Sequence, residues 1–194
     1  MTIKIKSPIV DWLTEWERMV LKSRIFTEKK EEELRILFAS TENSTTDSVD
    51  NILNIWAWGS SEYVGKVIWD ENKIITHIDR TPFKWIDKIA DATNLPFDDN
   101  SFDVTLFLRV LHHINDFEKA LEEALRVTKK GWHILLSEPH KYFVRVQDFV
   151  WLWKHPENIV SAKDIIKFWE NNDVLVEQLW RLFLFYFWYK LQKR

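Results

Sequence analysis

Apolar runs separated by polar, helix-like stretches recur along the chain and predict strands alternating with helices. The runs expected to form strands lie at 52–55, 73–78, 88–90, 104–108 and 133–137. Short runs of apolar residues are typical of strands that are buried on both faces of a parallel sheet. The region from 51 to 137 therefore predicts an α/β fold, in which helices cover both faces of a parallel sheet.

The two ends of the chain differ from this central region. Residues 8–38 predict two helices broken near residue 26, and residues 39–50 form a polar loop. A further helix is expected at 61–68. Two strands are expected at 174–179 and 183–189, and their short connection predicts an antiparallel hairpin at one edge of the sheet.

Polar residues mark the ends of two later helices. Asn115 is expected to cap one helix, with Glu118 three residues later as the second half of a capping box. Gly131 is expected to end that helix as the residue after its last turn. Ser161 and Asp164 predict the same kind of cap for a final helix that ends near residue 170.

The turn after the first predicted strand carries tryptophan where a strand–loop–helix unit usually carries glycine. The chain has 12 Trp and only 3 Gly in 194 residues, whereas a domain of this length has about 14 Gly. Some bacterial lineages read the UGA codon as glycine. We therefore hypothesise that several tryptophans, among them Trp56, Trp58 and Trp132, are glycines translated with the wrong code. The alternative is that they are true tryptophans, in an enzyme that has lost its glycines. UGG codons at these three positions would refute the hypothesis.

Composition narrows the class of protein. The length fits a single domain, 1–194, and the net charge of −3 gives no basic surface for nucleic acid. The absence of cysteine excludes disulfides and thiolate metal sites and suits a reducing cytoplasm. The most apolar run, 182–188, is far shorter than the ~20 residues of a membrane span, and we expect no stable membrane insertion. The histidines and acids show no spacing typical of a metal site.

Two carboxylates are placed to bind a ligand at the end of the sheet. Asp79 follows the second predicted strand, 23 residues after Trp56, and Asp91 follows the third. An acid about 20 residues beyond the turn can accept hydrogen bonds from ribose hydroxyls. Asp91 could accept from an adenine amino group. Each acid alone is weak evidence, because acids often end strands.

Four segments together point to one family. They are Asp91-Ala-Thr-Asn-Leu-Pro-Phe-Asp-Asp-Asn-Ser-Phe-Asp103, Val110-Leu-His-His-Ile114, Ala120 to Val127, and Leu135-Leu-Ser-Glu-Pro139. Their order and spacing resemble the class I S-adenosylmethionine-dependent methyltransferases, in the type-11 small-molecule branch, which have a Rossmann-like fold. The resemblance covers roughly 50–140, which it implies is the cofactor-binding core. The N-terminal helices, 1–45, and the C-terminal helix and strands, 141–194, resemble the family only loosely.

The resemblance implies a set of residues that bind S-adenosylmethionine. Trp56, Trp58 and Ser60 fall on the three loop glycines, together with Ala57 and Gly59 between them. Asn54 falls where the family usually has an acid near the amino end of the cofactor. The remaining matched positions are the ribose acid Asp79 with its neighbour Arg80, the adenine pair Asp91 and Ala92, and Leu108 and Arg109 at the end of the fourth strand. Two indoles in the glycine loop would fill the volume of the cofactor, so the literal sequence predicts weak binding or none.

The paired histidines are candidates for catalysis. His112 and His113 match the histidines that often follow the fourth strand in this family. Either could act as a base if the acceptor must lose a proton, although methyl transfer can also proceed by positioning alone. A structural alternative is that one ring packs and the other caps the next helix. His140 and Tyr142 are weaker candidates on the same rim.

Three functions are consistent with the sequence. The first is a cytoplasmic methyltransferase that acts on a small-molecule acceptor. The second is a non-catalytic, methyltransferase-like scaffold that has lost the cofactor. The third, a nucleic-acid binder that stacks bases on tryptophan, is opposed by the negative net charge.

Overall fold

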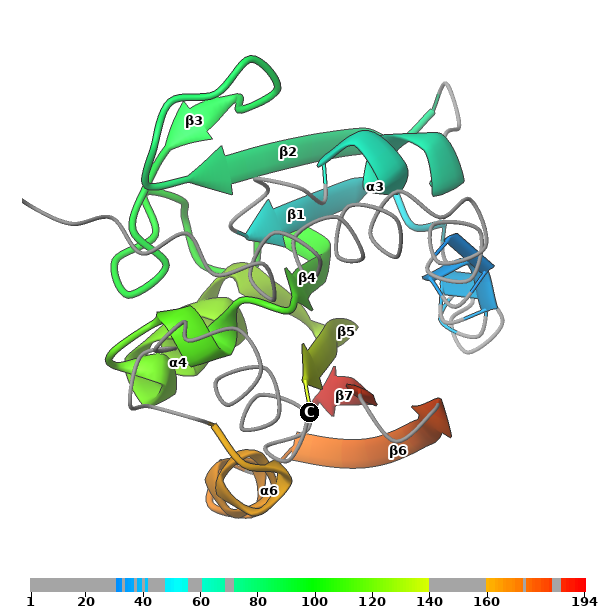
Figure 1. Ribbon diagram of the computed structural model, residues 1–194, viewed down its shortest axis with the longest axis vertical. Coiled ribbons are helices and arrows are strands. Elements are labelled where there is room, and N and C mark those ends of the chain that lie inside the picture. The colour runs from blue at the N-terminus through cyan, green and yellow to red at the C-terminus, as the bar shows by residue number, and fades with distance from the viewer. Residues whose placement is uncertain are drawn as a thin grey trace, which may run out of the picture.

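The computed structural model describes residues 31–32, 34–36, 38–39, 41, 48–55, 61–68, 72–139, 160–172, 174–182 and 186–194. These residues form one seven-stranded sheet with the strand order β3-β2-β1-β4-β5-β7-β6 (Figure 1). The strands are β1 Asn51–Ile55, β2 Ile74–Asp79, β3 Lys88–Ile89, β4 Phe102–Leu108, β5 Thr128–Pro139, β6 Val174–Leu182 and β7 Tyr186–Lys193.

The sheet is parallel from β3 to β5 and antiparallel at the other edge. β1 pairs in parallel with β2 and with β4, and β5 pairs in parallel with β4. β7 is antiparallel to both β5 and β6. The predicted fold class is therefore confirmed, including the C-terminal hairpin. The chain runs outward from β1 to β3 and then returns to β4, so the strand order reverses between β1 and β4.

Helices cover both faces of the sheet (Figure 1). The described helical elements after β1 are α3 Ser61–Val67, the short 3₁₀ helix η1 Leu111–His113, α4 Phe117–Val127 and α6 Ala162–Glu170. Residues of α4 and α6 pack into one buried cluster, which includes Leu121, Ala124 and Trp169. Residues of α3 and the helical segment near 31–41 pack into another cluster on the opposite face, which includes Leu34 and Val64. Every residue of β4 is buried, as expected for a strand with helices on both sides.

Helix α4 begins one residue later than predicted. Its cap is Asp116, whose Oδ1 accepts a hydrogen bond from the backbone N–H of Lys119 over 3.1 Å. The prediction of Asn115 as the cap was wrong. A carboxylate can cap as well as an amide, and it also interacts favourably with the positive end of the helix dipole.

Helix α4 also ends earlier than predicted, and Gly131 does not cap it. The cap is Thr128, which is already extended, and β5 begins there. The last carbonyls of the helix accept hydrogen bonds from other groups. The carbonyl of Val127 accepts from the N–H of Ser101 over 2.8 Å, and the carbonyl of Ala124 accepts from the hydroxyl of Thr128 over 2.6 Å. No glycine is therefore needed at the helix end, and Gly131 instead lies within β5 with a positive φ of 80°.

Several other boundaries move by a few residues. β4 starts at residue 102 rather than 104, and residues 39 and 41 are helical although a loop was predicted from 39. The capping box of Ser161 and Asp164 is confirmed. Residues 8–30, predicted to be helical, lie outside the described part of the chain.

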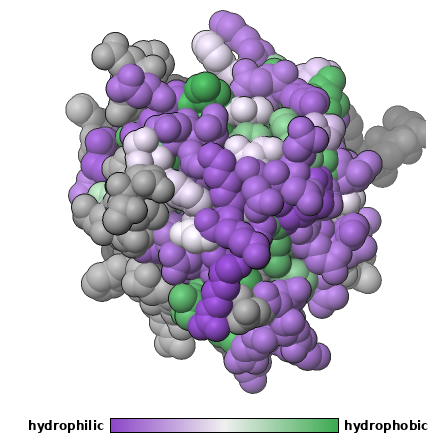
Figure 2. All heavy atoms as spheres, turned by 180° about the vertical axis from the view of Figure 1, so that it is seen from behind, coloured by the Kyte–Doolittle hydropathy of each residue, from purple (hydrophilic) through white to green (hydrophobic). Residues whose placement is uncertain are grey.

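The face opposite to that in Figure 1 is mainly hydrophilic, with small separate hydrophobic areas (Figure 2). Among the described helices, none is long and apolar enough to cross a bilayer.

Parallel α/β sheets bind their ligands at the carboxyl ends of their strands. In this fold, a ligand site is therefore expected at the carboxyl ends of β1 to β5.

Candidate active site

A cleft lies at the carboxyl ends of β1, β2 and β3. Its lining residues are Ile55, Ile78, Asp79, Arg80, Ala90, Asp91, Ala92 and Ile114. Four of the predicted cofactor-binding residues, Asp79, Arg80, Asp91 and Ala92, are thus brought together, on the side of β1 away from β4. The walls are largely apolar, and the carboxylates of Asp79 and Asp91 provide hydrogen-bond acceptors.

Asp79 is the last residue of β2 and is almost fully buried, with 2% of its surface exposed. Its Oδ1 accepts a hydrogen bond of 2.9 Å from the backbone N–H of Thr81. This bond fixes the carboxylate in the wall of the cleft. A buried acid held in this way can accept hydrogen bonds from vicinal hydroxyls of a sugar.

Asp91 also lines the cleft and is held by its own turn. Its Oδ1 accepts from the backbone N–H of Thr93 over 2.9 Å and from the Thr93 hydroxyl over 2.8 Å. The backbone hydrogen bond from Thr93 is the main cause that lowers the pKa of Asp91, with Arg80 adding a smaller charge effect and burial opposing both. Arg80 Nε lies 3.6 Å from Asp91 Oδ2. The carboxylate is therefore kept ionised and available as an acceptor.

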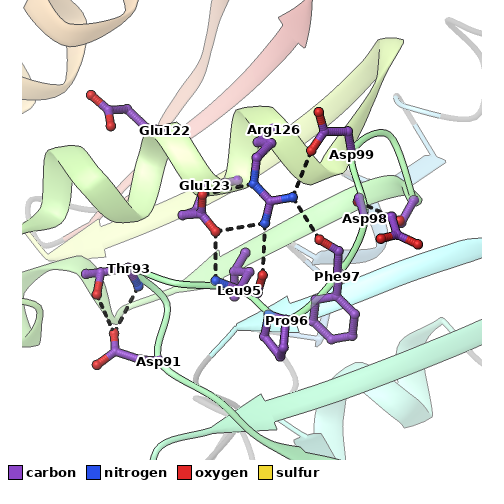
Figure 3. A network of polar contacts seen from close by, with 12 residues as sticks. Asp91, Thr93, Leu95, Pro96, Phe97, Asp98, Asp99, Glu122, Glu123 and Arg126 are labelled. Atoms are coloured by element: carbon purple, nitrogen blue, oxygen red, sulfur yellow. Dashed lines mark hydrogen bonds and ion pairs between the residues drawn. The ribbon is translucent and has the colours of Figure 1, made fainter.

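The loop after Asp91 is anchored to helix α4 (Figure 3). Arg126 donates hydrogen bonds to the backbone carbonyls of Leu95 and Phe97 over 2.9 and 2.7 Å, and it pairs with Glu123 through two nitrogens. Glu123 Oε2 in turn accepts from the backbone N–H of Leu95 over 2.7 Å. Neither Arg126 nor Glu123 was among the predicted site residues. Their spacing of three on one helix signals an ion pair but not the loop that it holds.

The turn after β1 is the part of the predicted site that the structure does not describe. Trp56, Ala57, Trp58, Gly59 and Ser60 all lie outside the described residues.

Asn54, just before that turn, is buried and does not line the cleft. Its Nδ2 lies 3.0 Å from Nδ1 of His77 on the neighbouring strand β2. Because an amide N–H₂ donates, His77 Nδ1 accepts. Burial is the main cause that lowers the pKa of His77 and favours the neutral ring that this contact requires, while the charge of Asp87 opposes it.

Leu108 and Arg109 end β4 as predicted, and the chain turns sharply there. Leu108 is buried, and Arg109 has a φ of 61°, in the left-handed region that residues other than glycine rarely adopt. The N–H of Arg109 donates to the carbonyl of Ser137 in β5 over 2.6 Å. Strained backbone of this kind is concentrated at functional sites. Neither residue lines the cleft beside Asp79.

The two histidines follow this turn in η1 and have different surroundings. His112 is buried, and its Nδ1 lies 2.7 Å from Oε2 of Glu138 at the end of β5. His113 is exposed. The ring centroids of His112 and His113 lie 4.0 Å apart. The described residues contain no group of acids and histidines that could hold a metal ion. His140 and Tyr142 lie outside the described residues.

Glu138 is a buried acid near this turn that was not among the predicted site residues. It is 2% exposed, and its Oε1 accepts from the backbone N–H groups of Val110 and Leu111 over 2.7 and 2.8 Å. Its position in the sequence could have identified it, because Glu138 is an acid near the end of the strand β5, just as Asp79 is at the end of β2.

The described part of the cleft fits the nucleoside half of S-adenosylmethionine. Asp79 offers an acceptor for ribose hydroxyls, Asp91 offers one for an adenine amino group, and Ile78, Ala90 and Ile114 provide apolar walls for a planar base. The methionine half would lie against the turn at 56–60 by position in the sequence. The hydrogen-bond acceptors and apolar walls of the cleft therefore agree with the cofactor that the sequence resemblance implied.

Comparison with known proteins also finds similarity to methyltransferases. Residues 70–136 match a family model described as a methyltransferase domain. A demethylmenaquinone methyltransferase of Paenarthrobacter aurescens is 54% identical over 54 residues, which cover 27% of this chain and 21% of that protein. A ubiquinone/menaquinone biosynthesis C-methyltransferase of Idiomarina loihiensis is 49% identical over 49 residues, 25% of this chain and 20% of that protein. The matches thus span about a fifth of the length of these curated relatives.

The fold is shared over almost the whole chain with solved structures. A SAM-dependent methyltransferase from Aquifex aeolicus superposes with a TM-score of 0.62 at 16% identity, covering 97% of this chain and all of that one. At this identity the likeness concerns the fold alone. Residues 70–136 of this chain are therefore similar to a methyltransferase domain, and the curated relatives that match part of the chain are named as methyltransferases.

Proposed function

We propose that this protein transfers a methyl group from S-adenosylmethionine to a small organic acceptor. The observation that carries the proposal is the pair of fixed carboxylates, Asp79 and Asp91, which both line one cleft at the carboxyl ends of β2 and β3. Both lie within the segment that matches the methyltransferase domain. The absence of cysteine favours the reducing cytoplasm as its location.

The residues of the cleft would hold and orient the cofactor. Asp79 would accept hydrogen bonds from the ribose, and Asp91 would accept from the adenine amino group, on a loop that Arg126 fixes to α4. When bound, the cofactor supplies an electrophilic methyl group on a positively charged sulfur. Because that methyl group is already activated, the main task of the protein is to align the acceptor with it.

We propose an aromatic ring with hydroxyl or quinone oxygens as the class of acceptor. The relatives are named for demethylmenaquinone and for ubiquinone and menaquinone biosynthesis. Such a ring is flat and largely apolar, and it would have to approach the end of β4 and β5, beside η1. The non-catalytic scaffold is the second candidate, and the literal tryptophans at 56 and 58 favour it.

Two measurements test the proposal on the full chain. Isothermal titration with S-adenosylmethionine should show a single saturable site. Incubation with the cofactor labelled on its methyl group should transfer label to a demethylated quinol but not to RNA or DNA. Binding without transfer to any quinol or phenol would support a different acceptor. The glycine-restored chain is the variant in which Trp56 and Trp58 are both changed to glycine. If this variant also binds no cofactor, the scaffold is the better description.

A further inference from the structure

We propose that the loop between β2 and β3, residues 80–87, docks the protein on the surface of an anionic lipid bilayer. The loop carries two aromatic side chains that face solvent, Phe83 with 42% and Trp85 with 62% of its surface exposed. Ile89, in the edge strand β3, is 59% exposed. The proposal concerns binding at the bilayer surface, needs no segment that crosses the bilayer, and does not depend on the proposed methyl transfer.

Exposed apolar side chains are concentrated at this edge of the sheet. Seven large hydrophobic residues are exposed in the described part of the chain, and three of them fall between positions 83 and 89. The two aromatic residues among the seven are both in the loop. Single exposed hydrophobic residues are normal on protein surfaces, whereas clusters of them mark surfaces that bind another protein or a membrane.

The tip of the loop is a closed turn. The N–H of Ile86 donates to the carbonyl of Phe83 over 3.1 Å and closes the turn that includes Trp85. At the base, the N–H of Asp87 donates to the carbonyl of His77 over 2.9 Å, and Asp87 Oδ2 accepts from the N–H of His77 over 2.7 Å. The turn is therefore attached to β2 and lies at the outer edge of the sheet, at the top of the view in Figure 1. Because the tip is already formed, it loses little conformational freedom on binding.

The charges beside the two aromatic residues indicate which kind of surface fits. The loop and β3 contain one acid and three cations, which are Arg80, Lys84 and Lys88. This local excess of positive charge contrasts with the net charge of −3 for the whole chain. The ammonium group of Lys84 lies 4.8 Å from the centre of the Trp85 ring. Tryptophan is enriched at the headgroup level of bilayers, and basic residues near the surface are attracted to anionic lipids.

Arg80 connects the loop with the cleft. It begins the loop and also lines the cleft, where its Nε lies 3.6 Å from Oδ2 of Asp91. Lys88 is directed toward the ring of Phe97, 4.8 Å from its centre, so Lys84 is the cation at the tip. A bilayer seated on the tip would lie beside this edge of the cleft. That position would suit a methyl acceptor dissolved in the bilayer, a consequence that rests on the proposed methyl transfer.

A bilayer fits this surface better than a protein partner does. A stable protein interface buries about 800 Å² on each partner, whereas two aromatic side chains bury about 300–500 Å² together. Lysine is depleted from protein interfaces, but Lys84 stands between Phe83 and Trp85 in the chain. β3 has only two residues, so it offers little edge to which another strand could be added. A single turn can enter the headgroup layer without a complementary groove.

Co-sedimentation of the full chain with lipid vesicles tests the proposal. Vesicles of equal parts phosphatidylglycerol and phosphatidylcholine should bind the chain, and vesicles of phosphatidylcholine alone should bind it much less. Changing Phe83→Ser and Trp85→Ser together should weaken binding to the anionic vesicles at least about tenfold, because both apolar contacts are lost. The matched control is Leu175→Ser with Val176→Ser, which removes exposed apolar residues from the opposite edge of the sheet and should leave binding unchanged.

A second variant tests the contribution of charge. Lys84→Gln should weaken binding to the anionic vesicles about fivefold, the usual effect of one basic residue near such a surface, and should not change binding to phosphatidylcholine. Lys119→Gln removes an exposed cation from α4 and should have no effect.

A fluorescent label locates the contact. The chain has no cysteine, so one label can be placed at a single engineered position. An environment-sensitive fluorophore on Phe83→Cys should shift its emission to shorter wavelength when anionic vesicles are added. The same fluorophore on Leu175→Cys should not.

The outcomes separate this proposal from the alternatives. Equal binding by the unmodified chain and the Phe83→Ser, Trp85→Ser variant would overturn it, as would an unmodified chain that does not bind anionic vesicles or equal shifts from both labels. A dimer in sedimentation equilibrium that these two substitutions dissociate would assign the loop to a second copy of the chain and would also overturn it. Vesicle binding is measured without S-adenosylmethionine, so absence of cofactor binding or methyl transfer would refute only the proposed function.

Discussion

Arg126 donates a hydrogen bond from Nη2 to the backbone carbonyl of Leu95 over 2.9 Å, and so ties helix α4 to a loop 31 residues earlier in the chain. The same guanidinium reaches the carbonyl of Phe97 and the carboxylate of Asp99 (Figure 3). Because the loop begins at Asp91, the helix controls the position of a residue in the cleft without touching the cleft itself.

We expect Arg126→Lys to loosen this loop. Lysine keeps the positive charge but cannot donate to two carbonyls and two carboxylates at once. The free energy of unfolding should fall by about 1–3 kcal/mol, the usual value of hydrogen bonds to a charged group. Urea denaturation measures the loss, and faster hydrogen exchange at the N–H of Leu95 locates it. Arg35→Lys, on an exposed ion pair of 3.9 Å, is the matched control. Equal stability of the two variants would contradict the proposed anchoring.

Asp79→Asn should weaken cofactor binding while preserving the fold. Asparagine can still accept from the N–H of Thr81, but it lacks the charge and the second acceptor oxygen that two ribose hydroxyls require. The expected loss of binding free energy is about 1.5–3 kcal/mol, measured by titration with S-adenosylmethionine in the glycine-restored chain. Asp98→Asn, on the exposed part of the loop, should bind normally. An unchanged dissociation constant for Asp79→Asn would place the ribose elsewhere.

His133 should make the protein less stable in mild acid. Burial is the main cause that lowers the pKa of this residue to about 4, and the charge of Lys190 adds to it. In the unfolded chain the ring takes up a proton as the pH falls through about 6.5, but in the folded chain it does so only near 4. The stabilisation is therefore complete above 6.5 and is lost progressively as the pH falls to 4.

The comparison uses His133→Leu, which keeps an apolar residue in β5 but cannot titrate. Between pH 6.5 and 4, the unfolding free energy of the unmodified chain should fall by roughly 2 kcal/mol more than that of the variant. His77, whose pKa burial also lowers, is present in both proteins and cancels. Parallel stability curves over this range would show that His133 does not contribute.

The order of strands and helices could be predicted because the core follows local patterns. The buried runs of β1 and β4 and the capping box of α6 are visible in a few neighbouring residues. The end of α4 could not be predicted in this way. Its last carbonyls bond to Asn100 and Ser101, from a loop about 26 residues earlier, and only the folded chain brings that loop there.

The candidate site, like the fold, could be predicted from the sequence only in part. Asp79 and Asp91 could be identified because parallel strands place their carboxyl ends together. The pairing of His112 with Glu138 depends on the register between β4 and β5 and on the turn at Arg109. Neither is visible in the spacing of residues along the chain.

Three of the tryptophans occupy different environments. Trp169 is fully buried and packs edge-on against Phe168, Trp132 is partly buried against a core cluster, and Trp85 is 62% exposed. The fold thus accommodates indoles in the core and in β5. We expect circular dichroism of the literal sequence to show mixed α/β content, and a disordered or aggregated product would contradict this.

Trp56 and Trp58 should decide between the methyltransferase and the scaffold. They follow β1 directly, at positions where the family has glycines, and a glycine loop can bring its backbone against a ligand because it has no Cβ. Two indoles there would occupy the space of the methionine half of the cofactor, and overpacking alone typically costs 1–3 kcal/mol. Changing both residues to glycine should therefore tighten binding of S-adenosylmethionine at least about tenfold, which corresponds to 1.4 kcal/mol. Titration of both proteins in one buffer measures this, with Trp85→Gly as the control for loss of an indole far from the turn in sequence. Tight binding by the literal sequence would show that these residues do not lie against the cofactor, whereas binding by neither protein would favour the scaffold.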